Sequence, residues 1–352
     1  MARAFNSFPE ILSHGFDTVI DVRSPAEFAE DHVPGAINLP VLDNEERARV
    51  GTIYKQQSPF LARKLGAALV FRNAAAHIEG PLAHHEGGWR PLVYCWRGGQ
   101  RSGSFAWMLR EIGWRAEVID GGYRSFRRLV NAVLYERPLP HRLVQLGGYT
   151  GTAKTEILGR LQARGVQVLD LEGLARHRGS LLGGQVGGQP NQKGFETALG
   201  VALDALDPGR PVVVEAESSK IGEITLPPSL WAAMKAAPWI EIEVPLAARA
   251  EYLTEAYDDI LSDAESLREK LTPLRRFRGH EVVDGWMDRI AVDDRRGLTQ
   301  ALMEEHYDPA YRRSMKAVAP EIVARIAAES LDAAAQDKAA AEIEAVLQTI
   351  SI

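Results

Sequence analysis

The sequence is poor in cysteine: Cys95 is the only one among 352 residues. A single cysteine excludes an intramolecular disulfide and a zinc site built from several cysteines. Long hydrophobic runs are also missing, since no stretch of about 18 apolar residues occurs. The first ten residues, MARAFNSFPE, lack the apolar segment of a secretory signal peptide. We therefore expect a cytoplasmic protein that does not enter a membrane.

An excess of positive charge is absent as well, because the formal net charge is -6. This disfavours indiscriminate binding of nucleic acid by the whole surface, but it leaves room for local basic patches. For each such patch, a solvated helix face is the alternative interpretation. The candidate nucleic-acid contacts are Arg124, Arg127 and Arg128 around Phe126, and Arg275, Arg276 and Arg278 around Phe277.

Hydrophobic residues make up 45% of the chain and charged residues 25%, as in ordinary globular proteins. Strands are expected at 18–22, 91–94 and 116–119, and a helix over 102–113. A strand, a helix and a second strand form a βαβ unit, which implies a parallel sheet. Two prolines within Glu136–Pro140 mark a boundary. We therefore expect one domain over 1–137 and another over 138–352.

The second domain repeats the α/β pattern, with strands expected at 142–146, 212–215 and 239–244. From residue 247 onward the chain is expected to be mostly helical, and the tail over 320–347 is expected to form one or two helices. The predicted fold class is α/β, with two parallel-sheet domains and a helical C-terminal region.

Cys95 stands directly between a predicted strand and a predicted helix. Backbone N–H groups at such a position bind anions and favour a thiolate, so we expect Cys95 to act as a nucleophile, assisted by Arg97 and Arg101. A buried core cysteine is the alternative. A phosphatase is the second alternative, because Arg101 lies six positions after Cys95, the spacing of the Cys-x5-Arg phosphatases. The loop is therefore wide enough for a tetrahedral oxyanion, and its length alone does not choose between hydrolysing a phosphate and receiving an atom from one. The expected N–H cradle comprises Trp96, Gly98, Gly99 and Gln100.

A glycine-rich turn follows the strand at 142–146 and precedes another helix. Its pattern is typical of a phosphate-binding P-loop, although Ala153 replaces the second glycine. The residues expected to bind phosphate or diphosphate are Gly148, Gly151, Thr152, Lys154 and Thr155.

Two further segments of the second domain are candidate parts of the same site. Glu215 and Glu217 end the strand at 212–215 and are candidate acid or magnesium partners, with helix capping or a salt bridge as the alternative. The glycine-rich segment 178–193 is expected to be a mobile loop that contacts substrate, with a linker as the alternative.

Two early segments, Asp21–Phe28 and His32–Pro40, resemble the signatures of rhodanese-like domains. Such a domain followed by a P-loop NTPase-like domain resembles the tRNA 2-selenouridine synthase family over nearly the whole chain. The stretches that carry this resemblance are 51–56, 58–60, 63–66, 94–102, 177–180 and 189–196.

The resemblance implies a two-step conversion of 2-thiouridine to 2-selenouridine at the wobble position of bacterial tRNAs. A geranyl group from geranyl diphosphate is first attached to sulfur, and selenium from selenophosphate then replaces the thioether. Cys95 would carry the selenium, and we expect the P-loop to hold the geranyl donor. A selenophosphate supplier is the implied partner; no tightly bound cofactor is expected, and magnesium is compatible with the P-loop. Two alternatives stay open: a tRNA sulfurtransferase with an ATP-binding P-loop, and a module that only senses or scaffolds.

Overall fold

The computed structural model describes residues 1–180, 182–184 and 187–350. The chain divides into two compact units, one comprising Met1–Arg137 with Pro190–Asp204 and the other Pro138–Gln189 with Ala205–Ile352. The first boundary falls at the proline-rich break, whereas the return of 190–204 to the first unit is absent from the linear division expected above. Part of the expected mobile loop, residues 181, 185 and 186, lies outside the described residues.

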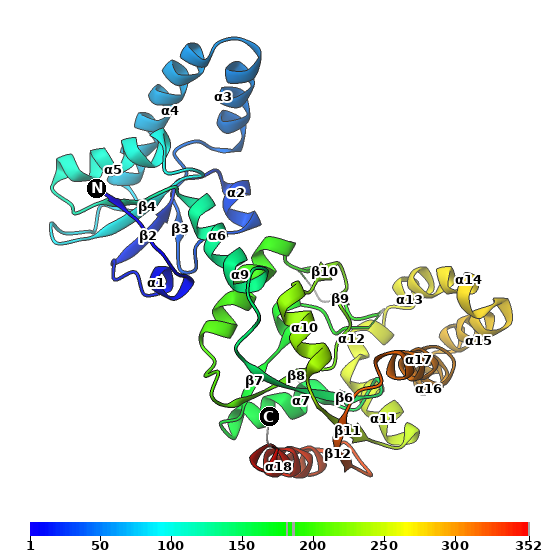
Figure 1. Ribbon diagram of the computed structural model, residues 1–352. Helices are drawn as coiled ribbons and strands as arrows, with labels where there is room; N and C mark the ends of the chain where they lie inside the picture. Colours follow the sequence, from blue (N-terminus) through cyan, green and yellow to red (C-terminus); the bar gives the residue numbers. More distant parts are fainter. Residues whose placement is uncertain (181, 185–186, 351–352) are drawn as a thin grey trace. The chain divides into compact units, whose positions relative to one another are not determined.

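The first unit is built on a five-stranded sheet in the order β1-β5-β4-β2-β3, and every neighbouring pair in it is parallel. Helices flank this sheet (Figure 1). Its strands are β1 (Ala2–Arg3), β2 (Thr18–Asp21), β3 (Ile37–Asn38), β4 (Pro91–Tyr94) and β5 (Glu117–Ile119). Its helices are α1 (Phe8–Leu12), α2 (Pro25–Glu30), α3 (Asn44–Gln56), α4 (Pro59–Glu79), α5 (Gln100–Ile112), α6 (Tyr123–Leu134) and α9 (Gln192–Asp204).

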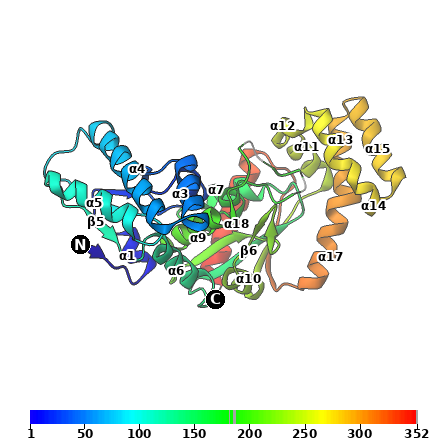
Figure 2. The same ribbon diagram turned by 90° about the horizontal axis from the view of Figure 1, so that it is seen from above.

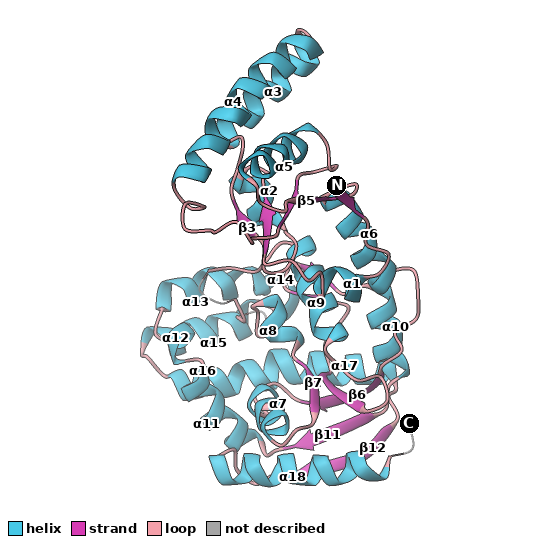
Figure 3. Ribbon diagram, turned by 90° about the vertical axis from the view of Figure 1, so that its left-hand side faces the viewer, coloured by secondary structure: helices cyan, strands magenta, loops and turns pink. Residues whose placement is uncertain are grey.

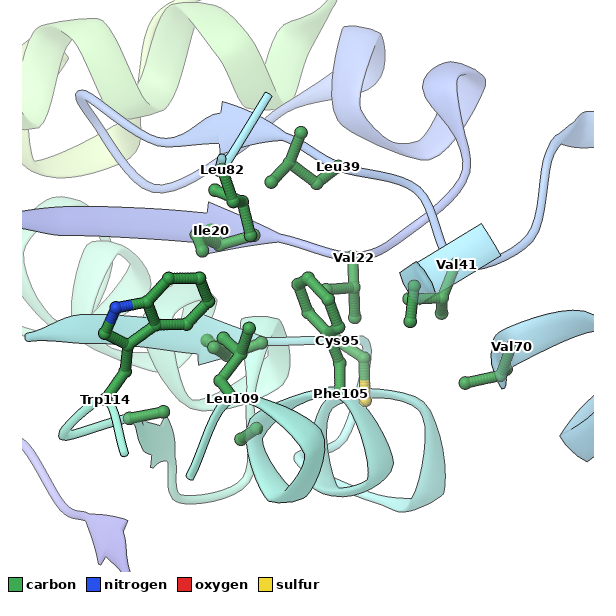
Figure 4. Close-up of a cluster of buried hydrophobic side chains, with 14 of the residues drawn as sticks. Ile20, Val22, Leu39, Val41, Val70, Leu82, Cys95, Phe105, Leu109 and Trp114 are labelled. Carbon is green, nitrogen blue, oxygen red and sulfur yellow. The ribbon is translucent and has the colours of Figure 1, made fainter. Parts of the chain in front are cut away.

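The core of the first unit forms where α5 covers the sheet. Phe105 and Leu109 are one helical turn apart on α5 and are fully buried, as expected for an amphipathic helix. They pack with Ile20 and Val22 from the region of β2, and Figure 4 shows Cys95 among these side chains. Burying side chains of this size contributes roughly 1.5–3 kcal/mol each. The strand that leads to Cys95 is therefore firmly anchored.

The second unit contains another five-stranded sheet, in the order β12-β11-β6-β8-β7, which is also parallel throughout. Figure 2 shows α13, α14 and α15 gathered at one end of this unit, apart from β6. The strands are β6 (Arg142–Gly148), β7 (Gln167–Leu169), β8 (Pro211–Glu215), β11 (Trp239–Glu243) and β12 (Ile322–Ala327), with an antiparallel pair β9 (Lys220–Ile221) and β10 (Ile224–Thr225).

Helices make up most of the rest of the second unit, and they confirm the expected helical C-terminal region. They are α7 (Lys154–Ala163), α8 (Leu171–Ala175), α10 (Pro228–Ala236), α11 (Leu246–Ala256), α12 (Asp258–Leu261), α13 (Ala264–Leu271), α14 (Arg275–Arg278), α15 (His280–Ala291), α16 (Arg295–Leu302), α17 (Asp308–Val318) and α18 (Ala333–Thr349), together with a 3-10 turn (Thr272–Leu274) and a π-helical turn (Met303–Tyr307).

The expectation of a purely helical tail was wrong. Residues 322–327 form β12, an edge strand parallel to β11 that pairs Ile326 with Ile242. Along β12, Val323 and Arg325 are exposed while Ile326 is buried, which is the two-residue period of a strand. The partner strand lies far away in the sequence, so the alanine-rich composition concealed this pairing. Only the second half of the tail, α18, is helical.

The two sheets place their loops in a similar way. In each sheet the chain proceeds to opposite sides from two adjacent strands, β2 and β4 in one and β6 and β8 in the other. Ligands of open parallel sheets bind beyond the carboxyl ends of strands at such points. Cys95 follows β4, and the glycine-rich turn follows β6. Within the described residues, no helix is long and apolar enough to span a bilayer.

Candidate functional site

Cys95 lies at the base of a loop whose backbone donors are free. The thiol is nearly buried, with 3% of the residue exposed, and Ser102 Oγ lies 3.1 Å from its Sγ. Gly99 caps α5 without a side-chain hydrogen bond. Among the described residues, none accepts a hydrogen bond from the backbone N–H groups of residues 96 to 101. Free N–H groups around a helix N-terminus attract an anion, so this part of the expected cradle has the donors that it requires.

Two glycines allow the loop to approach the neighbouring turn. Gly98 and Gly122 both have left-handed backbone angles, at φ +64° and +59°. A Cβ on Gly122 would lie 2.3 Å from the Cys95 carbonyl oxygen and 2.4 Å from Gly98 N. Tyr123 N then donates to the same carbonyl at 2.9 Å. The turn between β5 and α6 therefore packs against the backbone of the cysteine loop and supports it.

The two arginines of the loop have different surroundings. Arg97 is exposed and has no ion pair among the described residues, whereas Arg101 forms a salt bridge with Glu27 of α2 at 3.0 Å. Burial is the largest single influence and raises the pKa of Glu27, but the charge and hydrogen bond of Arg101, together with Ser24 N and Arg47, hold that pKa below its ordinary value. Arg97 is thus the cation that is free to meet an incoming anion, and Arg101 also fastens α5 to α2.

The expected phosphate loop lines a cavity of about 600 Å³ in the second unit. Lys154 Nζ donates to the carbonyl oxygens of Gly148 at 3.1 Å and Tyr149 at 3.4 Å. Burial lowers the pKa of Lys154, against the effect of nearby carboxylates. A buried amine over the mouth of a P-loop exchanges such carbonyls readily for phosphate oxygens. The predicted residues Gly148, Gly151, Thr152, Lys154 and Thr155 all line the cavity.

Ala153 occupies the position where the P-loop pattern has glycine. Its φ is +54°, in the left-handed region, and the residue is 4% exposed. This conformation costs a non-glycine residue about 1–2 kcal/mol. The substitution is therefore accommodated without a change of loop path, at the expense of local strain.

The acidic partners differ from those expected. Glu217 lines the cavity, but it hydrogen-bonds Glu172, which follows β7 and was not among the predicted residues. Burial raises the pKa of both carboxyls, and that of Glu172 reaches about 8. Thr155 Oγ1 lies 3.3 Å from Glu172 Oε2. The short strand that ends just before Asp170 would have identified Glu172 as a candidate, because ligands bind beyond the carboxyl ends of parallel strands.

Glu215, the other predicted acidic partner, is not part of the cavity wall. It is fully buried, and its Oε2 accepts a hydrogen bond from Leu171 N at 2.9 Å. Burial raises its pKa well above the ordinary value, and the hydrogen bond from Leu171 N joins β8 to α8. The described residues contain no cluster of three or more His, Cys, Asp or Glu suited to a metal. Glu172, Glu217 and Thr155 are the groups nearest to what a magnesium ion would require.

Side chains from α11 and α17 brace the phosphate loop. Arg249 forms a buried ion pair with Asp308 at 2.8 Å and donates to Thr150 O at 3.1 Å. Gly148 N donates to Tyr311 Oη at 3.0 Å. The sequence pattern contained no signal for these contacts, because their residues lie 99 and 163 positions from their loop partners. The helical region therefore holds the loop in place.

The lining of the cavity also includes aromatic and apolar side chains. These are Leu253, Ala256 and the tyrosines Tyr252, Tyr257 and Tyr307. A smaller pocket of about 20 Å³ shares Leu253, Tyr257 and Tyr307 with the cavity and adds Leu261 and Leu302. The lining thus combines groups that bind an anion with groups that contact a hydrocarbon.

The arginine clusters are only partly available for contacts outside the chain. Arg127 is partly buried and forms salt bridges with Glu196 and Asp31, so it supports α9 within the first unit. Arg275 pairs with Asp284, and Arg278 binds His306 through both Nδ1 and the carbonyl oxygen. Arg124, Arg128 and Arg276 are exposed. The structure therefore does not form either trio into a continuous basic face.

Comparison with known proteins follows the same division of the chain. The family profile described as "Rhodanese-like domain" matches residues 6–129, and that described as "tRNA 2-selenouridine synthase AAA domain" matches residues 141–290.

Curated relatives extend the similarity across both units. A protein named tRNA 2-selenouridine synthase from Nitrosomonas europaea is 37% identical, over 82% of this chain and 76% of that protein. Proteins of the same name from Hahella chejuensis and Chromohalobacter salexigens are 33% and 35% identical, over 87% and 85% of this chain and 88% of each relative. With a rhodanese-like unit, a P-loop unit and relatives of this similarity, the chain belongs to the tRNA 2-selenouridine synthase family.

Proposed function

We propose that the chain converts 2-thiouridine in tRNA to 2-selenouridine by alkylating the sulfur and then exchanging it for selenium. As a member of its family, the chain is a tRNA-modifying enzyme. One observation carries the finer proposal: a thiol in a cradle of free N–H groups occurs together with a P-loop cavity whose lining includes apolar side chains. These two sites match a selenium donor and a prenyl donor in chemistry.

The alkylation step is assigned to the P-loop cavity. Its backbone N–H groups and Lys154 would bind the diphosphate of geranyl diphosphate, while Leu253 and Tyr257 would contact the hydrocarbon chain. The sulfur of 2-thiouridine attacks the carbon bonded to the diphosphate, a C–S bond forms, and diphosphate leaves with the electrons of the C–O bond. Bound cationic groups stabilise the charge that develops on this leaving group.

The exchange step is assigned to Cys95. The cradle and Arg97 would receive the selenophosphate anion, and the Cys95 thiolate would attack its phosphorus, so that an S–P bond forms, the P–Se bond breaks and hydrogen selenide anion is released. The selenium then attacks C2 of the base and the geranylthio group leaves as geranylthiol. Alkylation helps because a thiol is a better leaving group than a thiocarbonyl sulfur. Water hydrolyses the S–P bond to phosphate and restores the thiol, so the step needs no oxidant and no second cysteine, which the chain lacks.

The competing function is sulfur transfer to tRNA with ATP in the P-loop. The apolar side chains in the lining of the 600 Å³ cavity, Leu253 and Ala256, support the prenyl donor. The adjoining pocket, at about 20 Å³, has room for little more than a water molecule. The two functions differ in their products: one yields geranylated and selenated nucleosides, and the other yields thiolated nucleosides in an ATP-dependent reaction.

Nucleoside mass spectrometry tests the proposal. The protein is incubated with 2-thiouridine tRNA, geranyl diphosphate, selenophosphate and a thiol, and the tRNA is then digested. Cys95→Ser is expected to accumulate geranylated nucleoside without selenation, since removing a nucleophile that acts as part of a unit costs about 10³-fold or more in rate. Lys154→Ala is expected to lose most geranylation, whereas Lys316→Ala, at an exposed lysine of α17, retains both products.

Three results would count against the proposal. Selenouridine formed at the normal rate by Cys95→Ser would remove the cysteine from the exchange. Undiminished geranylation by Lys154→Ala would remove the P-loop from the alkylation. Products that require ATP and no geranyl donor would favour the sulfurtransferase.

A further inference from the structure

The hairpin of α3 and α4 carries a concentration of positive charge on a chain that is acidic as a whole. Residues 47–72 contain no Asp or Glu, although the whole chain has a net charge of -6. The cations in this segment are Arg47, Arg49, Lys55, Arg63, Lys64 and Arg72. Such a segment creates a local positive field on an acidic protein.

Most of this charge is not neutralised within the protein. Arg47 lies 3.7 Å from Glu27, and Arg72 pairs with Glu46. Among the described residues, no carboxylate forms a salt bridge with any of the other four cations. All four are exposed: Arg49, Lys55, Arg63 and Lys64.

The same hairpin exposes large apolar side chains, which a solvated helix pair has no reason to carry. Tyr54 is 57% exposed and Phe60 is 66% exposed. Tyr54 lies near the end of α3 and Phe60 near the start of α4, so both lie at the tip, close in sequence to Lys55, Arg63 and Lys64. An exposed aromatic surface surrounded by polar groups marks a binding site.

The hairpin is a built element rather than a loose loop. Ser58 accepts hydrogen bonds from Phe60 N and Leu61 N and so caps α4. A Cβ on Gly66 would lie 3.5 Å from Val50 Cγ1, which shows how closely the two helices pack. Figure 3 shows α3 and α4 as paired helices that extend away from the sheet of their own unit. The tip residues are therefore presented on a stable support.

The base of the hairpin leads to the cysteine loop. Phe71 of α4 meets Trp107 of α5 edge to face, with ring centroids 6.2 Å apart, and both rings are partly exposed, at 41% and 49%. The same helix α5 begins immediately after the loop of Cys95. Exposed aromatic side chains thus occur both at the tip and at the end of the hairpin nearer the thiol.

We propose that the α3–α4 hairpin is the surface on which the anticodon arm of tRNA docks. The choice of tRNA as the partner rests on the proposed function. Exposed cations without partners pair with phosphates, and exposed aromatic rings stack with unpaired bases, which is how single-stranded loops of RNA are bound. A wobble base lies in such a loop. Tyr54 and Phe60 stack on loop bases, and Lys55, Arg63 and Lys64 contact the backbone.

Fluorescence anisotropy with the full chain and a labelled anticodon stem-loop carrying 2-thiouridine tests this assignment. Arg63→Gln with Lys64→Gln is expected to weaken binding at least tenfold and to reduce the slope of log affinity against log salt by about 1 to 2. Phe60→Ser is expected to weaken binding about tenfold with little change in that slope. Arg115→Gln and Lys316→Gln, at exposed cations outside the hairpin, are the matched controls and retain affinity.

The outcomes separate this inference from the proposed function. If the wild type binds and modifies tRNA while both hairpin variants bind it equally well, the docking surface is wrong and the function stands; the basic face would then serve a protein or an anionic membrane. If the wild type has no affinity for the RNA, both proposals fail. Circular dichroism melts of the hairpin variants, expected to match the wild type, exclude unfolding as the cause of weak binding.

Discussion

Buried ionisable side chains are concentrated around the phosphate loop. Burial lowers the pKa of Lys154 and raises those of Glu172 and Glu217. Groups perturbed in this way disfavour folding, and they cluster at functional sites. This cost in folding free energy is consistent with a site that binds an anion, because a bound diphosphate would give the ammonium of Lys154 a partner.

Replacing Glu172 by glutamine tests this account through stability. The raised pKa of Glu172 means that the folded protein keeps a proton that the unfolded chain loses. Its stabilising contribution is therefore complete below its ordinary pKa of 4.5 and is lost as the pH rises to about 8. Glu172→Gln should flatten the fall in melting temperature across this window, by about 2–4 °C for each kcal/mol involved.

Thermal denaturation at a series of pH values provides the measurement. Glu223→Gln, at a glutamate whose side chain is 89% exposed, should follow the wild-type profile. If the melting temperature of Glu172→Gln falls with pH in parallel with that of the wild type across the whole window, Glu172 does not keep a proton in the folded protein.

At the scale of elements, turns between strands and helices determine the shape of both sites. The cysteine loop can curl only because the β5–α6 turn approaches its backbone at Gly98 and Gly122. The phosphate loop instead places Ala153 in a left-handed conformation and depends on Arg249 and Tyr311 for support. One loop is therefore stabilised by its own unit's turn, and the other by the helical region that follows it.

A methyl group at Gly122 should disrupt the cysteine loop selectively. The left-handed angle alone costs alanine about 1–2 kcal/mol, and its Cβ would overlap the Cys95 carbonyl. Gly122→Ala is expected to lower stability by more than this amount and to abolish selenation, while geranylation in the other unit continues. Nucleoside mass spectrometry and urea denaturation are the measurements.

Gly103→Ala is the matched control for this change, because nothing lies within 4 Å of a Cβ at that helical position. It should be neutral or slightly stabilising, as expected when alanine replaces glycine in a helix. Normal selenation by Gly122→Ala would mean that the loop does not need the close approach seen here.

At the scale of the whole molecule, the chain leaves the second unit and returns to the first. Helix α9 lies between β7 and β8 in the sequence but belongs to the first unit, where Glu196 pairs with Arg127 of α6 and accepts a hydrogen bond from Tyr135 Oη at 2.6 Å. Hydrogen bonding to Glu196 and burial raise the pKa of Tyr135 to about 12, with burial the larger cause. The two units therefore share one continuous chain at three crossings rather than one linker.

Removing the carboxylate of Glu196 should weaken the attachment of α9. Glu196→Ala leaves the guanidinium of Arg127 buried without its main partner, and breaking such a pair costs roughly 3–5 kcal/mol. Hydrogen exchange should then accelerate in α6 and α9 while β6 and β8 keep their protection. Glu79→Ala, at an exposed glutamate of the same unit, should change neither; equal exchange in both variants would show that the ion pair does not hold α9.

Much of the fold followed from local patterns. The β-branched runs before Cys95 and Gly148 predicted β4 and β6, the apolar spacing of Phe105 and Leu109 predicted α5, and the proline-rich break predicted the first boundary. These signals are readable because strand propensity, helical period and turn residues act over a few positions. The cradle donors and the P-loop residues could be named for the same reason.

The remaining features depend on partners that are distant in sequence. The alanine-rich tail became β12 only because β11 offered an edge, and α9 joined the first unit only because Arg127 and Asp31 met Glu196 and Thr197. Glu172 entered the site because β7 placed it beside Glu217. The sequence by itself determined the course of the two loops, since their glycines and backbone donors are contiguous there. The tertiary structure decided which carboxylates, aromatic side chains and arginines lie beside them, because burial and pairing are set by contacts between segments.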